Sequence, residues 1–96
     1  MTKDMALKSK LAVYEAAAED GGRALSDIAK ALKESPHDRD VLYNAALVYE
    51  LTNRRDQALL MLDSANKAGY PAEEIRKEPE LARLRADPRF ARLSLQ

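Results

Sequence analysis

The sequence repeats one pattern of residues at an offset of 34 positions. In the two copies, alanines align with alanines, and one large apolar residue aligns with another. The aligned pairs are Ala12 with Ala46, Ala24 with Ala58, Ile28 with Leu62, and Ala31 with Ala65. Self-similarity at a fixed period of about 20 to 50 residues is typical of chains that stack copies of one small unit. We therefore expect a repeat architecture.

The second copy, residues 39–72, predicts two helices folded back on one another. Apolar residues recur at three- and four-residue spacing on both sides of the polar stretch 52–56. Ala46 and Ala58 lie about one turn from the bend, where small side chains let two antiparallel helices approach closely. We expect Asp38 or Asp40 to cap the first helix. Asn53 should end the first helix in a left-handed conformation, and Gly69 should stop the second.

The first copy, residues 5–38, predicts helices over about 5–19 and 23–34. Leu7, Leu11, Ala12, Tyr14 and Ala18 recur at helical spacing in the first of them. A flexible turn is expected at residues 20–22, which end in two glycines. This copy is the less regular one, because Lys8 aligns with the apolar Leu42 and Tyr14 is one position out of step with Tyr49.

The pattern does not continue into the C-terminal tail. Pro79 would fall in the middle of a third first helix, where proline is not tolerated. Short helices are expected instead at about 72–77, 79–85 and 88–93, two of them opened by Pro after an acidic residue. Their apolar residues Ile75, Leu81, Leu84, Phe90 and Leu93 should fold back and cover the second copy.

Both copies resemble the tetratricopeptide repeat family. The residues that carry the resemblance in the second copy are Leu42, Ala45, Ala46, Tyr49, Ala58, Leu62 and Ala65. Leu42 replaces the usual first aromatic residue and Tyr70 the closing proline. The tail resembles the segment that ends many bacterial arrays of this family, including those of Ser/Thr kinases, with Glu78 in place of the usual Asp. The resemblance implies an all-α, right-handed solenoid within one domain, 1–96, made of repeat 1 (5–38), repeat 2 (39–72) and a C-terminal cap (73–96).

Composition argues against several classes of function. Sixteen basic residues balance 16 acidic ones, so no net field favours nucleic acid or an anionic membrane. There is no Cys and one His, His37, which leaves no zinc-ligand set, and we expect no metal and no cofactor. No serine has a partner arrangement typical of a nucleophile, and Arg54 and Arg55 are expected to keep their charges in water. We therefore expect a non-enzymatic, cytoplasmic protein, and the resemblance of the tail implies a bacterial one.

The family resemblance implies that the first helix of each repeat lines a concave, peptide-binding surface. Carried over by register, the peptide-binding residues would be Val13, Ala17, Asp40, Tyr43, Asn44, Leu47 and Glu50. Tyr43 and Leu47 are large and lie off the stripe that packs against the second helix. Two interpretations are open for them: contact with a peptide, or packing against a neighbouring helix or the cap.

The remaining residues of that surface narrow the expected partner. Asn44 fits one position of a family clamp for terminal carboxylates and would bond a ligand backbone. Glu74 and Glu78 occupy positions where that clamp needs basic residues, so an acidic C-terminal tail is disfavoured. The leading prediction is a protein–protein interaction module that binds a partner peptide or helix. The alternative is a structural or self-associating C-terminal module of a larger bacterial regulator such as a Ser/Thr kinase, with a homodimer through the uncapped first repeat.

Overall fold

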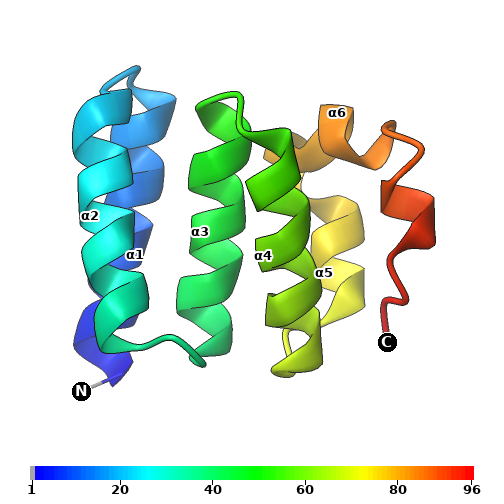
Figure 1. Ribbon diagram of the computed structural model, residues 1–96, viewed down its shortest axis with the longest axis horizontal. Helices are drawn as coiled ribbons and strands as arrows, with labels where there is room; N and C mark the ends of the chain where they lie inside the picture. The colour runs from blue at the N-terminus through cyan, green and yellow to red at the C-terminus, as the bar shows by residue number, and fades with distance from the viewer. Residues whose placement is uncertain (1) are drawn as a thin grey trace.

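Four long helices form two antiparallel hairpins in the computed structural model, which describes residues 2–96 and the side chains of residues 4–96. The first hairpin is α1 (Thr2–Ala17) with α2 (Gly21–Glu34), and the second is α3 (Arg39–Leu51) with α4 (Arg55–Lys67). The hairpins stand side by side, and α3 contacts α1, α2 and α4 (Figure 1). The prediction of an all-α chain is confirmed over the described residues, which exclude Met1 of the predicted domain.

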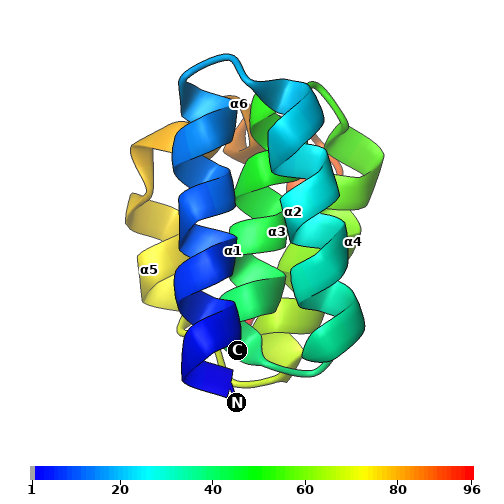
Figure 2. The same ribbon diagram turned by 90° about the vertical axis from the view of Figure 1, so that its left-hand side faces the viewer.

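Short helical segments complete the chain after α4. They are α5 (Ala72–Lys77), the 3-10 turn η1 (Pro79–Leu81), α6 (Ala82–Arg85) and the 3-10 turn η2 (Phe90–Arg92). The predicted helices at 72–77 and 79–85 are therefore confirmed, whereas the last one is shorter than expected. In Figure 2, α1 and α5 lie on one side of the molecule and α2 and α4 on the other.

The two hairpins bury equivalent residues at the 34-position offset. All four aligned pairs named above are fully buried or nearly so, including the alanines where the paired helices cross. Leu11 and its counterpart Ala45 differ, because Leu11 is 53% exposed whereas Ala45 is fully buried. The first hairpin covers this face of the second hairpin, and no described residue covers the same face of the first.

Three long helices end in the same Schellman geometry. At the end of α3, Asn53 has φ 64° and the N–H of Arg54 donates to the carbonyl of Tyr49 at 2.7 Å. Gly69 ends α4 in the same way with φ 109°, so the predicted left-handed Asn53 and the predicted helix stop at Gly69 are both confirmed. At the start of α3, Oδ1 of Asp38 accepts bonds from the N–H groups of Asp40 and Val41, which makes Asp38 the cap.

The expected turn at residues 20–22 is wrong. Gly21 begins α2, and the left-handed residue that ends α1 is Glu19, with φ 65°. The N–H of Asp20 donates to the carbonyl of Glu15 at 2.8 Å, which closes the motif one residue before the glycines. The glycines are therefore part of a helix and do not form a hinge.

Ion pairs join the second hairpin to the C-terminal segments. Arg55 donates two bonds to the Glu50 carboxylate, at 2.9 and 2.6 Å, and a third to Asp87 at 3.4 Å. Arg89 pairs with Asp87 and with Asp56. The expectation that Arg55 keeps its charge in water is wrong, because two carboxylates lie within its reach after the chain folds back.

Candidate partner-binding surface

A shallow pocket of about 340 Å³ opens between α1 and α3. Its lining is Ala6, Leu7 and Lys10 from α1, Asp40, Tyr43 and Asn44 from α3, and Tyr70 from the connection between α4 and α5. We call it the α1–α3 pocket. Three of the seven residues predicted to bind a peptide, Asp40, Tyr43 and Asn44, meet here.

Two stacked tyrosines form one wall of the α1–α3 pocket. The rings of Tyr43 and Tyr70 are nearly parallel, at 10°, with centroids 3.9 Å apart, and the Tyr43 hydroxyl donates to Oε1 of Glu78 at 3.4 Å. Burial raises the pKa of both phenols, and the nearby Glu78 carboxylate raises it further. Both hydroxyls therefore stay protonated at neutral pH and can donate hydrogen bonds.

Asn44 lies buried at the base of the pocket. Its Nδ2 donates to Oγ of Ser9 at 2.9 Å, and the Ser9 hydroxyl donates in turn to the carbonyl of Ala6 at 2.8 Å. Burying a polar group without a partner is costly, so this pair gives the amide nitrogen a partner and ties α3 to α1. The amide keeps a second N–H and its Oδ1, so the contact from Asn44 to a ligand backbone stays a prediction.

The other predicted binding residues lie outside the pocket. Val13 and Leu47 are buried in the core between the helices, and Ala17 is exposed at the end of α1. Glu50 is half-buried, with both carboxylate oxygens bonded to Arg55. Of the two interpretations left open for Tyr43 and Leu47, packing is the one visible in the structure. Peptide contact through any of the seven residues stays a prediction.

Sequence reasoning missed the exposure of three large apolar residues on α1. Leu7, Leu11 and Tyr14 are 71%, 53% and 61% exposed, although they recur at helical spacing. The buried face of α1 consists of small residues instead: Ser9, Ala12, Val13 and Ala16. The 34-position offset contained a signal, since Leu7 and Tyr14 align with Val41 and Val48, which are fully buried in the second hairpin. The equivalent surface on α1 is open to a partner.

Comparisons with protein-family models, with known proteins and with solved structures find no match. No helix in residues 2–96 combines the length and apolar character needed to cross a membrane. Over the same residues, no group of three or more His, Asp or Glu side chains is arranged to hold a metal ion.

Proposed function

We propose that the chain is a non-enzymatic interaction module of the tetratricopeptide type, which binds a peptide or helix of a partner protein across α1 and α3. The observation that carries this proposal is the α1–α3 pocket, with a fixed wall and an exposed apolar rim. Tyr43 and Asn44 are held by Tyr70 and Ser9, so little ordering is needed on binding. Leu7 beside them offers apolar area that is still exposed to water.

The charges around the pocket favour a particular partner. Lys10 and Asp40 stand on its rim, and the carboxylates of Glu74, Glu78 and Asp40 are close enough to Tyr70 to raise its pKa. An acidic tail would be repelled by these carboxylates. We propose that the partner segment is neutral or basic and places an apolar side chain against Leu7.

The two hairpins and the short C-terminal helices support assignment to a right-handed solenoid of this repeat family. The equivalent burial of residues 34 positions apart is the supporting observation. The proposal includes a bacterial, cytoplasmic setting. A second candidate function is a structural or self-associating C-terminal module of a larger regulator, and the uncovered outer face of the first hairpin favours it.

Selection from a displayed peptide library tests the binding proposal. Peptides selected on the wild-type chain should lose binding to Leu7→Asp, because the charge would stand where the apolar contact is made. Leu60→Asp is the matched control: Leu60 is a leucine of similar exposure, 63%, on α4 and outside the α1–α3 pocket. It should bind the same peptides as the wild type.

Two results would count against the proposal. One is a set of peptides that bind Leu7→Asp and the wild-type chain equally well. The other is a set that loses binding only to Leu60→Asp, which would place the binding surface on the opposite layer of helices. Circular dichroism of each variant separates loss of binding from loss of fold.

A further inference from the structure

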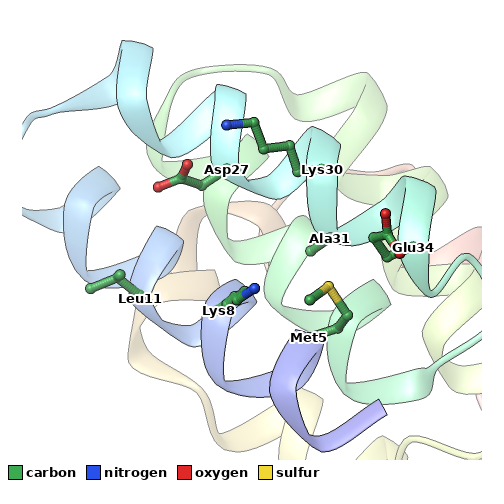
Figure 3. Close-up of a pocket in the computed structure, with 7 residues that line it drawn as sticks. All are labelled: Met5, Lys8, Leu11, Asp27, Lys30, Ala31 and Glu34. Carbon is green, nitrogen blue, oxygen red and sulfur yellow. The ribbon is translucent and has the colours of Figure 1, made fainter. Parts of the chain in front are cut away.

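We propose that a second copy of this chain covers the outer face of the first hairpin and forms a two-fold symmetric dimer. This face contains a groove of about 590 Å³ between α1 and α2. Its lining is Met5, Lys8 and Leu11 from α1 and Asp27, Lys30, Ala31 and Glu34 from α2 (Figure 3). Charges of both signs surround an apolar centre, and their order along each helix identifies the occupant.

When two copies of α2 lie antiparallel, each charge on one helix faces a charge of opposite sign on the other. Arg23, Asp27, Lys30 and Glu34 follow at spacings of four, three and four residues, so they share one face of the helix. Their signs alternate from positive to negative. In an antiparallel pair of α2 helices centred between Ile28 and Ala29, Arg23 lies opposite Glu34 of the second copy, and Asp27 lies opposite Lys30. Each charge meets one of opposite sign.

The same rule holds on α1. Lys8, Leu11 and Glu15 share a face, and an antiparallel pair centred beside Leu11 places Lys8 opposite Glu15 of the second copy. The two Leu11 side chains, each 53% exposed in the single chain, then meet near the centre. Burial of these side chains and the ion pairs around them would both favour association.

One two-fold axis serves both helices. Glu15 lies beside Arg23, with Oε2 4.0 Å from Nε, and also beside Asp27. Along the helix axes, Glu15 is therefore level with the midpoint between Arg23 and Asp27. The two helices run in opposite directions with the same rise per residue, so the centre beside Leu11 is level with the centre beside Ile28. Figure 3 shows the same relation, with Leu11 across from Asp27 and Met5 across from Glu34.

The carboxyl of Glu15 lies at the position that Lys8 of the second copy faces in this register. Its Oε1 is fully buried and has no hydrogen-bond partner among the described residues. Burial raises the pKa of this carboxyl, and the adjacent Asp27 raises it further. The positive charge of Lys8 of the second copy would favour the ionised form of this carboxyl without having to reach the enclosed Oε1.

The second hairpin shows which residue types contact a neighbouring repeat in this chain. Its equivalent residues, which face the first hairpin, are Leu42, Met61, Ser64 and Ala68, where the first hairpin has Lys8, Asp27, Lys30 and Glu34. None of these four is charged. In the part of the chain whose side chains are described, Lys8, Lys30 and Glu34 form no ion pair. The outer face is therefore suited to an occupant with matching charges, and the chain itself presents them.

Charge exchange tests this register. Sedimentation velocity over a concentration series should show the wild-type chain approaching twice the 10.7 kDa of one chain. Asp27→Lys alone and Lys30→Asp alone should each weaken the dimer by about tenfold or more, because each replaces two ion pairs by two like-charge contacts. Mixed in equal amounts, the two variants should form a heterodimer, since the lysine introduced in one chain then meets the aspartate introduced in the other.

A wild-type chain that stays at the mass of one chain at every concentration overturns the proposal. A wild-type dimer whose two variants do not associate when mixed overturns the proposed interface. The substituted residues lie outside the α1–α3 pocket, so both variants should keep the peptide binding proposed above. The outcome for the dimer is therefore independent of the outcome for peptide binding.

Discussion

Tyr43 links α3 to the C-terminal segments through contacts that are present before any ligand binds. Its ring is stacked on Tyr70 and its hydroxyl reaches Glu78. It remains only 6% exposed, so most of its surface contributes to packing. A residue in this position contributes to stability first and can support binding only by holding the pocket wall in place.

Substitution of Tyr43 separates the ring from the hydroxyl. Tyr43→Ala should lower the free energy of unfolding by about 3 kcal/mol, because it removes a buried aromatic ring and its stacking on Tyr70. Tyr43→Phe keeps the ring and loses one long hydrogen bond, so we expect a change within about 0.5 kcal/mol. Urea denaturation followed by circular dichroism measures both. Equal loss in the two variants would show that the hydroxyl, rather than the ring, is the stabilising group.

At the scale of whole elements, the C-terminal segments are attached by charged residues as well as by the apolar Ile75, Leu81 and Leu84. Asp87 accepts bonds from Arg89 and Arg55, and the Arg55 guanidinium also binds Glu50 at the end of α3. These hydrogen bonds, chiefly those from Arg89, hold the pKa of Asp87 well below its usual range. The network therefore depends on the ionised carboxylate of Asp87, to which both Arg55 and Arg89 donate.

This network predicts a pH dependence of stability. A carboxyl group with a lowered pKa in the folded chain contributes its full stabilisation above its unfolded pKa, about 3.9, and loses it as the pH falls further. The wild-type chain should therefore be more stable than Asp87→Asn at pH near 7, and the difference should shrink below about pH 4. Urea midpoints of both proteins at the two pH values measure it. A difference that is constant with pH would mean that the Asp87 charge does not hold these segments.

Most helix boundaries could be predicted because local residues determine them. Asn53, Gly69 and Asp38 each act through their own backbone or a neighbouring N–H group. Glu19 was missed because it takes a left-handed conformation that its residue type does not favour. The buried face of α1 was also missed, since periodicity identifies a stripe of apolar residues but not which stripe another helix covers. Arg55 and Tyr70 meet partners 32 and 27 residues away in the chain, which no local pattern reveals.

For the whole molecule, α1 is the helix with two open surfaces. One borders the α1–α3 pocket through Leu7 and Lys10, and the other borders the outer groove through Lys8 and Leu11. In the second hairpin the residues equivalent to Leu7 and Leu11, Val41 and Ala45, are fully buried. A peptide and a second copy of the chain could therefore occupy α1 together, on different surfaces.

The most direct test of the central claim is an NMR titration of a selected peptide into the isotope-labelled chain. The amide signals of Leu7, Lys10, Asp40 and Tyr70 should shift most, because these residues line the α1–α3 pocket. The control region is the groove lined by Leu32, His37, Leu42 and Met61, between the two hairpins. Shifts confined to that groove, with the pocket residues unchanged, would contradict binding across α1 and α3.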